Sequence, residues 1–174
     1  MRYLQIETDR LILRPLEISD AEHIFNTWTS DPRVTKYMTY TTHKSVDNTK
    51  QWLESVTANA DSENVLDTGF QLKETGKLIG SGGATYNSEH DRWDLGYNFA
   101  YDYWHKGYAT EAVRAVVGIL RAKGIRRFMA EHAVKNIYSG KVMEKIGMKF
   151  DRKGTYSCYD GRVFNANFYI MDLD

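Results

Sequence analysis

A short glycine-containing segment carries the clearest chemical signal in the sequence. Residues 103–112 read Tyr-Trp-His-Lys-Gly-Tyr-Ala-Thr-Glu-Ala and lie between an alternating apolar run and a run with helical periodicity. Gly107 and Ala109 place almost no side chain on a turn that begins a helix, so backbone N–H groups there can close on a phosphate. Lys106 adds a positive charge beside the turn. Taken alone, the pattern is also typical of an ordinary glycine turn before a helix.

The segments on either side of this turn predict one mixed α/β domain over residues 1–174. Strands are expected at residues 11–16, 65–72, 78–79, 92–100 and 127–133, followed by a hairpin with its turn at 159–162. Helices are expected at residues 19–30, 45–60, 110–123 and 139–146. Ser19 and Glu22 have the spacing of a capping box for the first helix. A strand–helix–strand crossover requires one parallel pair in an otherwise antiparallel sheet.

Composition and motifs argue against several classes of function. The formal net charge of zero speaks against a nucleic-acid or anionic membrane surface, and neither a Walker A nor a G-x-G-x-x-G motif is present. Cys158 is the only cysteine, so we expect no internal disulfide and a reducing, cytoplasmic location. Residues 1–7 lack the apolar core of a signal peptide, and no apolar run is long enough to span a bilayer. The histidines and the cysteine show no metal-ligand spacing, so no metal is expected.

Other segments give the glycine turn a more specific meaning. Residues 95–97 together with 103–112 resemble the acetyl-CoA-binding motif of the GNAT acetyltransferases. Residues 136–139 and 143–148 resemble the second conserved segment of that family, and the opening from Thr8 to Leu16 resembles its RimJ/RimL-like branch, which acetylates ribosomal-protein N-termini. The matches lie in order and cover nearly the whole chain.

This resemblance implies a GNAT-like α/β fold and a cofactor site. The sheet would be mixed, mostly antiparallel and seven-stranded, splayed between its fourth and fifth strands and flanked by about four helices. The pantetheine arm of acetyl-CoA would lie in the gap, because a splayed strand leaves backbone groups that an amide-rich ligand can satisfy. The cofactor-binding residues carried over by position are Asn98, Phe99, Ala100, His105, Lys106, Gly107, Tyr108, Ala109, Thr110 and Asn136.

Two side chains are predicted to act in acetyl transfer to a primary amine. A lysine-like amine titrates near ~10, so a base must remove its proton. Asp94 is the leading candidate, because related enzymes commonly carry Glu there; the alternatives are a solvated strand carboxylate or a group that orients the substrate. Many family members protonate the departing thiolate with a tyrosine, but Met143 aligns with it here. Ser139 is the predicted substitute and would stabilise the thiolate by a hydrogen bond, unless it only starts a helix.

The acceptor side is less defined. Trp28, His132, Tyr156 and Tyr159 are candidates to line it, although core packing or structural hydrogen bonding is the alternative for each. Strand alternation then turns Glu131 to the opposite face from His132. Cys158 has no local signature of a nucleophile.

Three questions stay open at this level. The acceptor is either a protein N-terminus, which needs an open groove, or a small amine such as a polyamine, an amino sugar or an antibiotic, which needs a closed acidic pocket. A non-catalytic acyl-CoA sensor or scaffold with the same fold is the alternative to an enzyme. The protein is expected to be a monomer or a homodimer.

Overall fold

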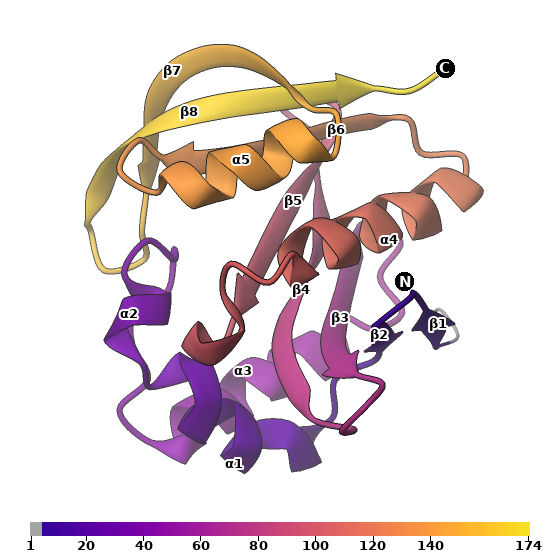
Figure 1. Cartoon of the computed structure of the whole chain (residues 1–174). Coiled ribbons are helices and arrows are strands. Elements are labelled where there is room, and N and C mark those ends of the chain that lie inside the picture. The colour runs from indigo at the N-terminus through magenta and orange to yellow at the C-terminus, as the bar shows by residue number, and fades with distance from the viewer. Residues whose placement is uncertain (1–4) are drawn as a thin grey trace.

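The computed structural model describes residues 5–174, which form one mixed sheet with helices packed on both faces (Figure 1). Eight strands follow the order β1-β2-β3-β4-β5-β6-β8-β7, and among the described pairs only β5 and β6 run parallel. The predicted mixed sheet with one parallel pair is thus confirmed; the count rises to eight because a two-residue edge strand, β1, is added. The strands are β1 Ile6–Glu7, β2 Leu11–Arg14, β3 Val65–Leu72, β4 Leu78–Asn87, β5 Arg92–Phe99, β6 Arg127–Ala133, β7 Lys149–Ser157 and β8 Val163–Asp172.

The helices follow the predicted segments closely. Those described are α1 Ala21–Ile24, α2 Pro32–Thr35, α3 Val46–Ala58, α4 Tyr108–Ala122 and α5 Ile137–Lys145, with short helical turns at Ile18–Asp20, Phe25–Thr29 and Tyr101–Tyr103. The turns at either end of α1 extend it into one helical stretch, which ends before Asp31-Pro32 as predicted.

The predicted capping box at Ser19 and Glu22 is wrong. The helical stretch already begins at Ile18, so the capping position falls on Glu17. The Asp20 carboxylate accepts a hydrogen bond of 2.9 Å from the Glu17 N–H. Two hydrogen bonds from Arg14, of 2.7 and 2.8 Å, hold the same carboxylate in place. The capping box is therefore formed by Glu17 and Asp20, two residues before the predicted pair, and Arg14 supports it.

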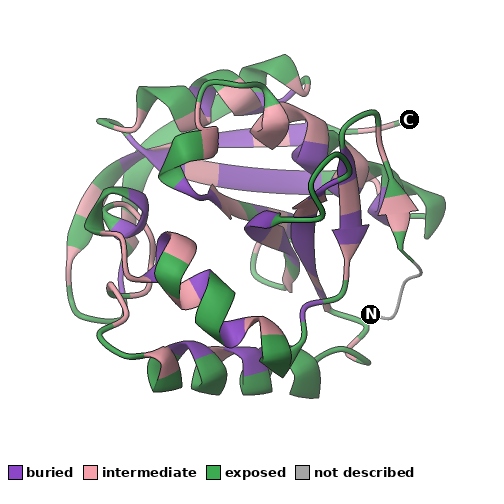
Figure 2. Ribbon diagram, turned by 60° about the horizontal axis from the view of Figure 1, so that its bottom comes forward, coloured by how far each residue is buried: buried purple, intermediate pink, exposed green. Residues whose placement is uncertain are grey.

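Two hydrophobic cores lie on opposite faces of the sheet. Helix α4 buries a stripe of apolar side chains against the strands, spaced as one face of an α-helix requires: Ala112, Val113, Val116, Ile119 and Leu120. The second core packs α1 and α3 through side chains such as Ile24, Trp28 and Leu53. Figure 2 shows the result, with buried strands enclosed by helices whose outer faces are exposed.

The expectation about a signal peptide concerned residues 1–7, of which residues 1–4 lie outside the described part of the chain. From residue 5 onward, no helix has both the length and the apolar character needed to cross a membrane. Cys158 is buried with a free thiol.

The sheet opens between β5 and β6. The two strands pair only at Trp93 with Phe128 and at Asp94 with Met129, although each strand continues well beyond those positions. On their other sides both strands are paired along nearly their full lengths, β5 with β4 and β6 with β8. The gap corresponds to the predicted splay between the fourth and fifth strands, and it places two strand edges against an open space.

Candidate functional site

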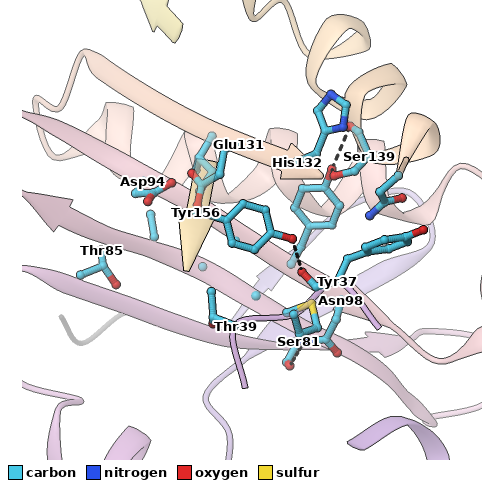
Figure 3. A pocket seen from close by; sticks show the side chains of 18 of the residues that line it. Tyr37, Thr39, Ser81, Thr85, Asp94, Asn98, Glu131, His132, Ser139 and Tyr156 are labelled. Atoms are coloured by element: carbon cyan, nitrogen blue, oxygen red, sulfur yellow. Dashed lines mark hydrogen bonds between the residues drawn. The ribbon is translucent and has the colours of Figure 1, made fainter. Parts of the chain in front are cut away.

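A cleft of about 480 Å³ passes through the splay. It is lined on one side by α5 and on the other by the loop at residues 37–39 and by the strand β7 (Figure 3). Both predicted catalytic residues, Asp94 and Ser139, lie in its wall. The cleft also brings together side chains that are far apart in the sequence, such as Tyr37 and Tyr156, which are 119 positions apart.

The glycine turn has the backbone conformation expected of an anion site. Gly107 lies in the left-handed region at φ 83° and directly precedes α4, and His105 has a positive φ of 61°. Only glycine adopts φ values of this kind freely. The first N–H groups of α4 have no partner inside the helix by its geometry, so they are available to bind an anion at this end.

A cluster of side chains from the segment before β2 and from the first turn of α4 holds the glycine turn in place. The Glu111 carboxylate accepts hydrogen bonds from the Thr8 hydroxyl at 2.6 Å and from the Arg10 backbone and guanidinium at 2.8 and 2.7 Å. Arg10 also donates to the Lys106 carbonyl at 2.9 Å and stacks over Tyr108 at 4.4 Å. Sequence reasoning used Thr8 and Arg10 only as family markers and assigned them no role; the structure shows that they position the turn.

The three consecutive residues predicted to bind the pantetheine arm differ from one another in whether their polar groups already have hydrogen-bond partners. Asn98 lines the cleft, and its side-chain Oδ1 is buried without a hydrogen-bond partner among the described residues. The Phe99 carbonyl accepts a 2.7 Å hydrogen bond from Trp104, and the Ala100 N–H donates to Ile79 at 2.8 Å. These two groups have internal partners, so of the three Asn98 is the candidate that stays. Asn136 also lines the cleft.

Two carboxyl groups meet where β5 and β6 part. Asp94 and Glu131 are half-buried and lie next to each other (Figure 3). A hydrogen bond joins the two side chains. Burial, followed by the neighbouring charge of Glu131, raises the pKa of Asp94 to about 8. Burial raises the pKa of Glu131 as well, against the opposing effects of the Asp94 hydrogen bond and the Arg152 charge. The pair therefore retains one proton near neutral pH and behaves as a single titrating unit.

The predicted orientation of two neighbours on β6 is wrong. Glu131 turns toward Asp94, whereas His132 is buried beneath α5, where a Cβ added at Gly140 would lie 2.7 Å from its Nε2. The His132 Nδ1 lies 2.8 Å from the Ala133 carbonyl. The two side chains do point to opposite faces of β6 and both line the cleft, but Glu131, which was not predicted to do so, is the one that lies beside Asp94.

Ser139 faces the other side of the splay with a phenol as its neighbour. Its hydroxyl lies 2.9 Å from the Tyr97 hydroxyl (Figure 3). Burial raises the pKa of Tyr97 to about 12, so this phenol stays protonated. Helix α5 starts at Ile137 with Asn136 in the capping position, so Ser139 does not start the helix. Met143 lines the cleft as well.

The remaining acceptor-side candidates divide between the core and the cleft. Trp28 is completely buried in the second core and does not line the cleft, so the packing alternative holds for it. Tyr156 and Tyr159 do line the cleft, and the Tyr156 hydroxyl donates to the Tyr37 carbonyl at 2.7 Å. Trp52 lines the cleft in place of Trp28.

The tip of the β7–β8 hairpin is attached to the loop at residues 36–40. The Tyr159 N–H donates to the Thr39 carbonyl at 2.9 Å. The Arg162 guanidinium donates to three carbonyls of that loop at 3.0 to 3.3 Å. We call these two segments, residues 36–40 and 156–162, the roof. They cover the side of the cleft that contains Asp94 and Glu131.

The described residues contain no group of three or more histidine, cysteine or acidic side chains arranged for a metal ion.

Comparison with known proteins gives a consistent result. Residues 10–149 match the acetyltransferase (GNAT) domain family. The N-acetyltransferase YoaA of Bacillus subtilis, itself uncharacterised, is 29% identical over 171 residues, which is 95% of each chain. A GNAT-family acetyltransferase of Bacillus anthracis superposes with a TM-score of 0.79 at 26% identity, over 97% of this chain and 98% of that one. RimL, a ribosomal alpha-N-protein acetyltransferase solved in complex with coenzyme A, superposes with a TM-score of 0.83 over 98% and 99% at 14% identity, which shows a shared fold.

Proposed function

The chain belongs to the GNAT acetyltransferase family, and from that premise we propose that it transfers the acetyl group of acetyl-CoA directly to a primary amine held beneath the roof. The observation that carries the proposal is the Asp94–Glu131 pair at the splay. A paired, half-buried carboxyl with a raised pKa is suited to remove a proton from an ammonium group near neutral pH.

The cofactor fits the residues on the other side of the splay. The N-terminus of α4 after Gly107 offers main-chain N–H groups to a pyrophosphate, and Asn98 and Asn136 offer amides to the pantetheine arm. The orphaned Oδ1 of Asn98 is satisfied when an N–H group of the arm donates to it. Acetyl-CoA supplies an acetyl group activated as a thioester.

The carboxyl pair prepares the attacking amine. An amine that enters as ammonium gives a proton to the pair and then has a free lone pair for the carbonyl carbon. Asp94 accepts this proton after it has lost its own, and the protonated Asp94 then stays hydrogen-bonded to Glu131. No covalent acetyl-enzyme is required, which agrees with the absence of a nucleophile signature at Cys158.

Ser139 and Tyr97 serve the leaving group. The two hydroxyls lie on the α5 side of the splay, opposite the carboxyl pair. A hydrogen bond from Ser139, itself hydrogen-bonded to a protonated phenol, stabilises the departing thiolate as the C–S bond breaks, and Ser139 keeps its own proton. The nitrogen loses its second proton as the amide forms, and this proton ends on the thiolate to give the free thiol of coenzyme A.

The test is release of free thiol from acetyl-CoA in the presence of amines, with cofactor affinity measured by calorimetry in parallel. Asp94→Asn is expected to lower kcat by about a hundredfold, and Ser139→Ala by about tenfold, because general-base and hydrogen-bond contributions differ by that order. Both variants should bind coenzyme A like the unmodified protein. Unchanged thiol release in both variants would refute the roles of Asp94 and Ser139, whereas tight cofactor binding with no thiol release from any of the three proteins would favour the non-catalytic sensor.

A further inference from the structure

One glycine in the wall of the cleft lacks a side chain for no reason of packing or backbone conformation. Gly82, Gly83 and Gly96 all line the cleft. A Cβ built on Gly82 or Gly83 would collide with a backbone carbonyl oxygen, so packing requires a glycine at both positions. A Cβ built on Gly96 would meet nothing within 4 Å, and the φ angle of Gly96 is not positive. Because glycine weakens the interior of a strand, a glycine of this kind often marks a place where a ligand approaches closely.

Gly96 lies on the face of the sheet that carries the carboxyl pair. Side chains alternate along β5, so Gly96 shares its face with Asp94, while Leu95 and Tyr97 point to the other face. Leu95 packs in the core beneath α4, and the Tyr97 hydroxyl contacts Ser139 on α5. The anion site at the start of α4 and the hydroxyl pair therefore lie on the far side of β5 from Gly96. The open space at Gly96 thus belongs to the acceptor and not to the cofactor.

The floor beside the carboxyl pair is flat. Gly96 pairs with Gly83 on β4, so neither strand has a side chain in this row, and the row two residues further on pairs Asp94 with Thr85. Standard strand spacing puts the Cα atoms of Gly96 and Asp94 about 7 Å apart. A planar group can rest on the two glycines while an amine, joined to it by a one- or two-carbon chain, reaches the carboxyl pair.

The wall beside this floor is aromatic and is held in place. The Tyr156 ring lies between Glu131 and Tyr37 (Figure 3), and its hydroxyl donates to the Tyr37 carbonyl at 2.7 Å. Phe164 packs against both tyrosine rings, with centroid distances of 5.7 Å to Tyr37 and 5.4 Å to Tyr156. Trp52 adds an aromatic side chain from α3. Aromatic side chains that are already fixed bind another ring at a low cost in conformational entropy.

The charges of the cleft exclude acidic acceptors. No lysine or arginine occurs among its lining residues in the described chain. A carboxylate or phosphate group on the acceptor would therefore find no counter-charge, and the carboxyl pair would repel it. The roof also limits size, because Arg162 and the Tyr159 N–H attach the hairpin tip to residues 36–40. A small acceptor that is neutral apart from its reacting amine satisfies both conditions.

We propose that the acceptor is a primary arylalkylamine without acidic groups, whose flat aromatic ring rests on Gly96 and Gly83. This rests on the proposed acetyl transfer and specifies its acceptor. The nitrogen then lies at Asp94 and Glu131, and the ring is enclosed by the aromatic wall. Gly96 determines this specificity, because a side chain there would occupy the space of the ring.

The experiment measures thiol release from acetyl-CoA with 2-phenylethylamine, ethylamine, 2-cyclohexylethylamine, spermidine and peptides that begin with serine or alanine. We expect kcat/KM to be at least about tenfold higher for 2-phenylethylamine than for ethylamine, because the ring buries apolar surface. It should exceed the value for 2-cyclohexylethylamine by about threefold, since that ring has the same number of atoms but is not flat. In Gly96→Leu the ratio of 2-phenylethylamine to ethylamine should fall to near one, and in Gly96→Ala part of the way.

Gly118→Leu is the matched control, because Gly118 lies on α4 outside the cleft and a Cβ there also meets nothing within 4 Å. It should leave the ratio as it is. Affinity for acetyl-CoA, measured by calorimetry, should be the same in all variants. Weaker binding in Gly96→Leu alone would assign the open space to the cofactor and overturn the proposal.

Three further outcomes would overturn the acceptor assignment and leave the transferase standing. They are equal use of the two ring amines, a preference for spermidine or peptides, and a ratio unaffected by Gly96→Leu. Absence of release with every amine from a cofactor-binding protein would overturn both the acceptor assignment and the transferase.

Discussion

The two halves of the cleft are built from different parts of the chain. The half that we assign to the cofactor offers mainly main-chain groups: the open edges of β5 and β6 and, beyond the residues that line the cleft, the start of α4 with the turn of two left-handed residues before it. The acceptor half consists of side chains from separate segments, among them Tyr37, Asp67 and Tyr156. A main-chain site depends on backbone conformation and tolerates most side-chain exchanges, whereas a side-chain site changes with single substitutions. Cofactor binding and acceptor choice should therefore be separable by mutation.

The strongest test of that separation removes both carboxyl groups at once. Asp94→Asn combined with Glu131→Gln should lower kcat by about a hundred- to a thousandfold, the usual contribution of a general base. Coenzyme A affinity should stay unchanged, since neither side chain belongs to the cofactor half. A double variant that retains more than a tenth of the wild-type kcat would show that the pair is not the base.

The converse test breaks the cofactor half alone. Gly107→Val places a β-branched side chain at φ 83° and should weaken coenzyme A binding by about a hundredfold, through backbone strain and obstruction of the amides. Gly124→Val is the control, because Gly124 has a similar φ of 85° at the far end of α4 and open space around it. Equal affinities of the two variants in calorimetry would mean that strain, and not anion binding, explains the effect.

Helix α5 packs closely against β6 between the two halves of the cleft. This close contact depends on the lack of a side chain at Gly140. Gly140→Ala should lower the free energy of unfolding by about 1–3 kcal/mol, since its Cβ would lie 2.7 Å from the His132 ring. Gly118→Ala, in the interior of α4 with nothing within 4 Å, should instead raise stability by about 0.5–1 kcal/mol. Chemical denaturation measures both; similar changes in the two variants would contradict the close contact.

The smallest expected effect is a shift in pH dependence. The pair works only after it has lost its reactive proton, so kcat should be low at acidic pH and rise through the raised pKa of Asp94, which is about 8. Glu131→Gln removes a negative charge beside Asp94, which lowers that pKa and should move the rise to lower pH by about one unit. Among neighbouring charges, Arg152 is unaltered in both proteins. A profile that stays in place in Glu131→Gln would show that the two groups titrate independently.

The same contrast explains what the sequence could predict. The turn at Gly107, the amphipathic α4 and the Asp-Gly hairpin are local patterns, so they were predicted within a few residues. The splay was also predicted, through the family resemblance. Local periodicity determines which residues share a face of an element. A motif of ten residues determines its own backbone conformation without help from distant segments.

The acceptor half could not be predicted in the same way. Strand alternation separates Glu131 from His132 but gives no information on which of them faces Asp94, because that depends on how β6 packs under α5. Asp67 enters the cleft only through the register of β3, β4 and β5, which is a long-range property. Trp28 and Trp52 are both aromatic residues in helical segments, and only tertiary packing buries the first and brings the second to the cleft.

The gap between β5 and β6 also has a consequence for folding. Past Asp94 and Met129 the sheet contains two strand edges that face each other without a ladder, an arrangement that costs stability when its amides and carbonyls lack partners. A ligand that pairs with those edges acts as a missing strand and completes the sheet. The melting temperature should therefore rise with coenzyme A concentration, by the equivalent of about 2.7 kcal/mol at a hundredfold excess over Kd. Cofactor binding is therefore expected to complete the pairing of the sheet and, with it, the folded structure.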